Sequence, residues 1–142
     1  MKRFIPITVL FGLFLLPSCK DKVCYQVNGI LDPYLQLFLK EAEKRNLHFN
    51  VEEDGLILEF ADLDEPTIGL CTYSDPLLVQ IDQEYWENVE EYENCEDLRE
   101  NVVFHELAHG LLNRRHDNEV MANKEWASLM CGGDEVEGRS WQ

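Results

Sequence analysis

The chain has 142 residues, with 28 Asp and Glu against 12 Lys and Arg and a formal net charge of -16. This length accommodates a single domain, and a hydrophobic fraction of 45% is ordinary for a globular protein rather than for a disordered acidic segment. Nucleic acids and anionic membrane surfaces attract basic proteins, so this charge excludes both as electrostatic partners.

The N-terminal segment has the pattern of a cleaved secretory leader. Two basic residues precede an apolar run from Phe4 to Leu16, which is too short to cross a bilayer as a helix. Cys19 follows the small residue Ser18 in an arrangement that resembles the bacterial lipobox, in which the new N-terminal cysteine is acylated. A signal peptide followed by an incidental cysteine is the alternative.

This leader divides the chain into three expected parts. We expect a lipoprotein signal peptide over residues 1–18, a tether over residues 19–31 and the folded domain over residues 32–142. A lipid on Cys19 would hold a monomeric domain at the cell envelope of a bacterium, facing the periplasm or the outside, and would be its only membrane contact. The residues after Cys19 do not decide between the inner and the outer membrane.

Four cysteines follow Cys19, an even number in a chain that is expected to leave the cytoplasm. This count predicts two disulfides, with the pairing open, and free buried thiols are the alternative. The four are Cys24, Cys71, Cys95 and Cys131.

The first element expected in the folded domain is a helix. Asp32 would be its N-cap and Pro33 its first helical residue, and apolar side chains then recur at helical spacing as far as Ala42. Asn46 is suited to end the helix.

Short strands are expected next. Leu47, Phe49 and Val51 alternate with polar residues, which predicts a strand that ends in a turn at residues 53–55. Further strands are predicted over residues 56–60, 67–73 and 77–81, the last of them apolar enough to be buried.

Residues 82–100 are crowded with carboxylates and predict a solvated helix and loop surface. The expected buried side of this segment consists of Tyr85, Trp86, Val89 and Tyr92. A calcium site is the alternative, but the spacing is not that of an EF-hand.

A second helix should begin near Asn94. Apolar residues surround most of it, which is typical of a buried helix. The domain is therefore predicted to be α+β, with an N-terminal helix, a small mixed β-sheet and a buried helix that carries polar residues in need of partners.

That buried helix contains the sequence His105-Glu106-Leu107-Ala108-His109, a His-Glu-x-x-His motif. Residues four apart lie on one face of a helix, so both imidazoles can bind one metal ion, and histidine nitrogen suits Zn2+. Zinc lowers the pKa of a bound water to about 7, and the adjacent Glu106 can accept the proton of that water.

The residues after this motif resemble the extended metzincin motif His-Glu-x-x-His-x-x-Gly-x-x-His. Leu112 stands where the family has Gly, and Arg115 stands where it has the third His. Asn113 and His116 keep the same separation one position later, and Asn is second to Gly at a left-handed helix end. The resemblance therefore implies a turn at Asn113 and His116 as third metal ligand, with Asp117 as the alternative.

Metzincins also place a methionine turn beneath the metal. The segment from Ala127 to Met130 resembles the Ser-Ile-Met form of that turn, whereas Met121 follows His116 too closely to loop back beneath the metal. Residues 105–133 further resemble small bacterial lipoproteins described as zinc metallopeptidases. This resemblance implies a metzincin-like fold with substrate antiparallel to an edge strand near residues 69–73.

A gluzincin-like third ligand, Glu119 or Glu125, is a further alternative that would need a second helix. The sequence as a whole predicts a zinc metalloendopeptidase that cleaves a peptide or protein substrate, with Glu106 as general base. The competing interpretation is a non-catalytic envelope lipoprotein, a binding module that keeps a structural or vestigial zinc site. Only 12 residues follow Met130, where metzincins have a further helix, so a minimal and weakly active form is also open.

Overall fold

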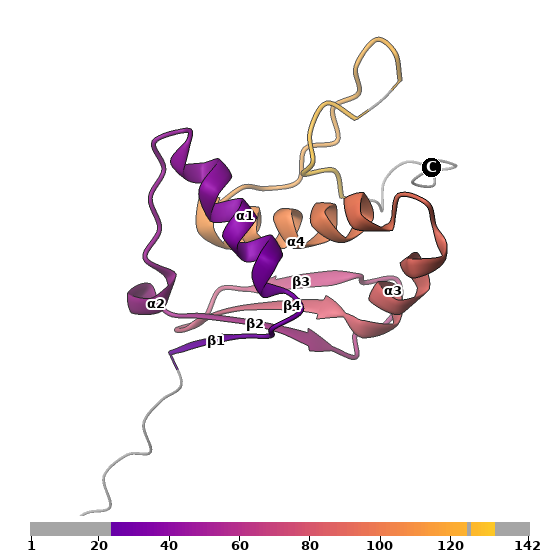
Figure 1. Ribbon diagram of the computed structural model, residues 1–142. Helices are drawn as coiled ribbons and strands as arrows, with labels where there is room; N and C mark the ends of the chain where they lie inside the picture. The colour runs from indigo at the N-terminus through magenta and orange to yellow at the C-terminus, as the bar shows by residue number, and fades with distance from the viewer. Residues whose placement is uncertain (1–23, 125, 133–142) are drawn as a thin grey trace, which may run out of the picture.

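A computed structural model describes residues 24–124 and 126–132 of the protein. The predicted signal peptide, the lipidation site Cys19 and residues 133–142 lie outside this range. Four strands form one mixed sheet in the order β1-β2-β4-β3 (Figure 1). Their bounds are Tyr25–Val27 (β1), Leu56–Ala61 (β2), Gly69–Thr72 (β3) and Leu77–Asp82 (β4).

The strand directions confirm the predicted small mixed sheet. β1, β2 and β4 are parallel to one another, whereas β3 lies at the edge and runs antiparallel to β4. In the register of β3 and β4, Gly69 is opposite Ile81 and Cys71 is opposite Val79. Directly opposite residues point to the same face of a sheet, so Gly69 and Cys71 share a face with two core residues.

Two long helices, α1 (Asp32–Glu43) and α4 (Cys95–Leu112), lie together on one face of the sheet (Figure 1). Shorter helical segments connect the other elements: α2 (Val51–Asp54), α3 (Gln83–Asn88) and the 3-10 helix η1 (Val89–Glu91). This arrangement is the predicted α+β fold, with a first helix before most of the sheet and a later helix packed on it.

The core lies between the sheet and these two helices. Alternate residues of β2 and β4 point toward the helices, as the two-residue period of a strand requires. The side chains that are fully buried there include Leu56, Leu58, Val79 and Ile81 from the strands, Leu35 from α1, and Val103 and Leu107 from α4. α4 is thereby fixed against β3 and β4, and its polar residues are held at the sheet edge.

The predicted strand over Leu47–Val51 is wrong. Leu47 is 42% exposed, and Val51 is buried as the first residue of the short helix α2 rather than as the end of a strand. The predicted turn at residues 53–55 is instead the end of α2, where Gly55 has a φ of 87°. Three alternating apolar residues are too few to distinguish a strand from a loop that buries one of them.

The N-terminal boundary of the domain also needs correction. The strand β1 pairs with β2 from Tyr25 onward, and Leu31 is completely buried, so the predicted tether does not extend to residue 31. Leu31, not Asp32, is the N-cap of α1, and Asp32 lies in the first helical turn. After α1, Asn46 adopts the left-handed conformation, with a φ of 59°, in the turn that follows.

Two further expectations are overturned. Trp86 and Val89 are buried as predicted, but Tyr92 is 60% exposed because the chain leaves η1 and turns away from the core there. Cys71, Cys95 and Cys131 are free thiols, so the prediction of two disulfides among the four cysteines is wrong. Cys71 lies in a strand and Cys95 begins a helix, so sheet and helix packing fix their positions without a crosslink.

Candidate metal centre

The second half of α4 carries the residues of the candidate centre. His105 and His109 lie four residues apart and therefore share one face of the helix, while Glu106 is buried beside them. The helix ends at Asn113, which has the left-handed φ of 50° that was expected there. The backbone N–H groups of Asn113 and Arg114 both donate to the Ala108 carbonyl, and the chain turns back toward the helix.

This turn brings a third histidine to the helical pair. One ring nitrogen each of His105, His109 and His116 can be chosen so that all three lie within 4.8 Å of one another. The two helical rings approach most closely, with 3.0 Å between their Nε2 atoms. Two nitrogen ligands of a tetrahedral zinc ion lie about 3.3 Å apart, so the spacing is close to that of a metal centre.

The outer nitrogens of the helical histidines are engaged by backbone carbonyls. His105 Nδ1 lies 2.9 Å from the Leu129 oxygen, and His109 Nδ1 lies 2.7 Å from the Arg114 oxygen. A carbonyl oxygen only accepts, so both Nδ1 atoms carry the proton and the Nε2 lone pairs point at each other. This arrangement of outer hydrogen bonds is the one that metal-binding histidines have in proteins, and the residues present therefore fit a zinc ion.

Burial lowers the pKa of His105, although the hydrogen bond to Leu129 acts in the opposite direction. The ring is therefore held in the neutral form that a metal ligand requires. The third ring is different: His116 belongs to an exposed loop.

Glu106 lies between α4 and the edge strand. Its side chain is almost completely buried, and this burial raises the pKa of the carboxyl group to about 7, while a hydrogen bond from the Cys71 backbone N–H acts to lower it. Burial of the Cys71 side chain, together with the nearby Glu106 charge, raises the pKa of the Cys71 thiol to about 11, so that this thiol stays protonated. The centre thus combines three imidazoles with one carboxyl group that is not needed as a ligand.

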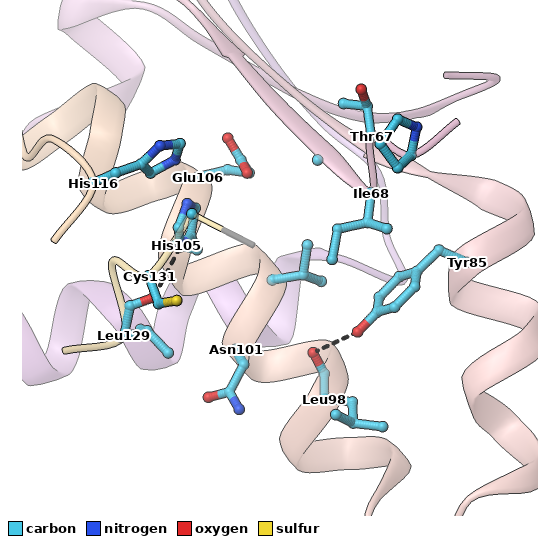
Figure 2. Close-up of a pocket in the computed structure, with 14 residues that line it drawn as sticks. Thr67, Ile68, Tyr85, Leu98, Asn101, His105, Glu106, His116, Leu129 and Cys131 are labelled. Atoms are coloured by element: carbon cyan, nitrogen blue, oxygen red, sulfur yellow. Dashed lines mark hydrogen bonds between the residues drawn. The ribbon is translucent and has the colours of Figure 1, made fainter. Parts of the chain in front are cut away.

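A pocket of about 500 Å³ opens beside the histidines and Glu106 (Figure 2). One wall is formed by Ile68 and its neighbours before β3, and the opposite wall by α4 at Leu98 and Val102. Tyr85 closes one end, with its hydroxyl directed toward the Leu98 carbonyl, and Leu129 lies near His105 (Figure 2). Most of this lining is apolar, so the pocket suits a large apolar side chain.

The two candidate methionines of the predicted methionine turn differ in burial. Met130 is 4% exposed and belongs to the core cluster, whereas Met121 is 46% exposed. Met130 follows Leu129, whose carbonyl accepts from His105, and its own carbonyl accepts from the Asp117 N–H at 2.7 Å. Met130 is thus buried next to the segment that contacts the metal centre.

The alternative third ligands are not part of the histidine group. The Asp117 carboxylate accepts the backbone N–H of Glu119 at 3.2 Å, which occupies it in a local turn. Among the residues that the structure describes, the group that could hold a metal contains neither Asp117 nor Glu119. Glu125 lies outside the described residues.

Sequence reasoning did not identify four contributors to the site. Two are the backbone carbonyls of Arg114 and Leu129, which bind the outer histidine nitrogens. Two are Gly69 and Gly132, where an added Cβ atom would collide with Glu106 and His116 respectively. Every residue has a backbone carbonyl, so the sequence cannot single out the two that bind the histidines. For the other two, the only signal was the residue type, because a glycine lets a neighbouring side chain approach the backbone closely.

No family model, curated protein or solved structure matches the chain. The described part of the chain contains no helix with both the length and the apolar character needed to cross a membrane.

Proposed function

We propose that this protein is a zinc-dependent peptidase, in which His105, His109 and His116 hold Zn2+ and Glu106 transfers protons. The observation that carries the proposal is the convergence of three imidazoles whose helical pair has its outer nitrogens bound to carbonyls. A structural zinc site has four protein ligands, whereas a catalytic one has three and keeps a position open. The group found among the described residues has three members, which favours catalysis.

Glu106 is the residue that distinguishes a hydrolase from a metal-binding module. When bound, zinc supplies Lewis acidity toward a water molecule and a peptide carbonyl. The Glu106 carboxylate accepts a proton from the attacking water and delivers it to the departing amine. Its near-complete burial and the Cys71 N–H hold the carboxylate in place beside the histidines.

The open edge of β3 supplies a binding site for the substrate backbone. The Asp82 N–H donates to the Ile68 carbonyl at 3.0 Å, so alternate residues from Ile68 onward bond to β4. By that alternation the backbone groups of Gly69 and Cys71 face away from β4, and because the Cys71 N–H donates to Glu106, the Gly69 groups and the Cys71 carbonyl are the ones left for a substrate. An extended peptide that pairs with this edge would lie across the histidines, in the orientation that the metzincin resemblance implies.

The apolar pocket accounts for side-chain preference. It begins at the N-terminal end of β3 and extends along α4 on one side of the histidines. A peptide antiparallel to β3 would run toward this pocket, so the residue that follows the cleaved bond would enter it. We therefore expect cleavage before a large apolar residue, in a bacterial envelope to which the predicted lipid on Cys19 holds the enzyme.

The metzincin relationship is part of the same proposal. A mixed sheet with an antiparallel edge strand, a helix with the His-Glu-x-x-His motif, a left-handed turn and a buried methionine follow one another in this chain. Each feature has a local physical reason, and together they support a metzincin-like peptidase.

Cleavage of a complex peptide mixture tests this function. The zinc-loaded mature protein should cut the mixture, and Glu106→Ala should lower the rate by about 100-fold or more while it retains zinc. Glu93→Ala is a matched control, because Glu93 is an exposed carboxylate outside the site, and it should cleave as the wild type does. Equal cleavage by Glu106→Ala would refute the role of Glu106, and zinc binding with no cleavage by the wild type would favour a binding module.

A further inference from the structure

We propose that Gly132 and Gly69 are positioning residues, Gly132 for the third histidine and Gly69 for the carboxylate of Glu106. The Gly69 half rests on the proposed peptidase function, whereas the Gly132 half requires only the metal site.

Besides the rings of His105 and His109, at centroid distances of 5.2 and 4.8 Å, the His116 ring packs against Gly132. His116 is an exposed residue of the loop that follows α4, unlike the two helical histidines. A Cβ atom added at Gly132 would lie 2.5 Å from His116 Nδ1 and 2.8 Å from Cγ, far inside contact distance. The imidazole therefore rests directly on the Gly132 backbone.

The backbone conformation does not explain this glycine. The φ of Gly132 lies outside the left-handed region, so an alanine would meet no backbone strain there. What excludes a side chain is the ring of His116. The glycine at this position leaves space for the His116 ring and is not required by the backbone conformation.

Gly132 is itself held in place by the loop that carries His116. Its N–H donates to Asn118 Oδ1 at 2.9 Å, and the Asp117 N–H donates to the Met130 carbonyl at 2.7 Å. These two hydrogen bonds close the loop at its base and hold Gly132 beside His116. The same segment supplies the Leu129 carbonyl to His105, so it contacts two of the three histidines.

Gly69 occupies the equivalent position for Glu106. It is the first residue of β3 and faces α4, because it lies opposite the buried Ile81. An added Cβ would lie 2.7 Å from both Cγ and Oε1 of Glu106. Its φ is also outside the left-handed region, and the three atoms nearest to an added Cβ all belong to Glu106.

Substitutions at residues 132 and 69 should affect metal binding and proton transfer separately. A methyl group at residue 132 displaces a metal ligand, whereas one at residue 69 displaces only the proton acceptor. Gly29 is the matched control, since an added Cβ there meets nothing within 4 Å. A structural role for either glycine would instead lower stability without this division.

Three alanine variants of the mature protein test the proposal, with zinc affinity measured by chelator competition and cleavage measured on the peptide mixture. Gly132→Ala should weaken zinc binding by about 10- to 100-fold, as loss of a supporting contact does, and should alter the visible spectrum of the cobalt-substituted protein. Gly69→Ala should keep zinc affinity within about twofold and lower kcat by about 100-fold with little change in KM. Gly29→Ala should match the wild type in both.

Double variants keep the proposal falsifiable if a single variant folds poorly. In the His116→Ala background there is no ring to displace, so adding Gly132→Ala should not lower the thermal unfolding midpoint of the metal-free protein. Likewise, Gly69→Ala should not lower that midpoint in the Glu106→Ala background.

Unchanged zinc affinity in Gly132→Ala, or an equal loss of zinc in Gly69→Ala, would overturn the proposal. So would a lowered midpoint in either double variant. If no protein, wild type included, cleaves any peptide, the peptidase function fails, while weakened zinc binding in Gly132→Ala alone would still support the Gly132 half.

Discussion

Replacing Met130 by alanine should lower both the stability and the zinc affinity of the domain. Met130 is 4% exposed, and truncating a buried methionine to alanine costs about 2–5 kcal/mol of the free energy of unfolding. Its N–H donates to Ser128 Oγ and its carbonyl accepts from the Asp117 N–H, so a collapse into the cavity would move the loop that carries His116. Zinc affinity should then fall about tenfold or more.

Urea unfolding of the metal-free protein measures the first effect, and chelator competition measures the second. Met121→Ala is the matched control, because Met121 is 46% exposed and its truncation should change the free energy by less than about 0.5 kcal/mol. Met130→Leu nearly conserves volume and should cost less than about 1.5 kcal/mol. Equal losses in the two alanine variants, or zinc affinity that survives Met130→Ala unchanged, would refute the reasoning.

Three further predictions follow from other residues. Zinc at 100 times its dissociation constant should stabilise the protein by about 2.7 kcal/mol in thermal denaturation. The His116→Ala variant should lose most of this stabilisation, whereas His48→Ala, a change at an exposed histidine, should keep it. Equal stabilisation of the two variants by zinc would contradict the assignment of His116 as a ligand. Burial, together with the hydrogen bond to Glu96, raises the pKa of Tyr34 from 10.0 to about 12. The fold therefore favours the protonated phenol, so the contribution of Tyr34 to stability should be complete below pH 10 and should disappear as the pH rises to about 12. Ultraviolet titration of the wild type, with Tyr34→Phe as reference, should show a phenol that ionises near pH 12. Ionisation of this phenol near pH 10 would contradict the prediction. Asp82 is buried, and its carboxylate accepts from the Tyr85 and Leu63 backbone N–H groups at 2.7 and 3.0 Å. Asp82→Ala should therefore lower the free energy of unfolding in urea by about 1–3 kcal/mol. An unchanged unfolding midpoint would show that these two hydrogen bonds do not stabilise the fold.

Local spacing made the helical half of the centre predictable. His105 and His109 share a face of any helix that contains them, whatever the rest of the fold. The turn at Asn113 was predictable for a similar reason, since a left-handed residue at a helix end is a property of a few residue types. The sheet also followed in outline, because β2 and β4 are short apolar runs bounded by turns.

The remaining features depend on contacts between distant parts of the chain. The strand β1 has three residues, too few for a period, and it exists because β2 is available to pair with it. The apparent alternation that begins at Leu47 pairs with no strand among the described residues, and Val51 instead begins α2. The contact of Gly132 with His116 crosses a loop, and it has no signal in sequence spacing.

X-ray absorption of the purified mature protein after zinc loading tests the central claim most directly. We predict one zinc per chain with three imidazole nitrogens at about 2.0–2.1 Å and no sulfur ligand, and the His116→Ala variant should show two imidazoles or fail to retain the metal. A thiolate at about 2.3 Å, or a coordination shell that His116→Ala leaves unchanged, would contradict a centre built from His105, His109 and His116.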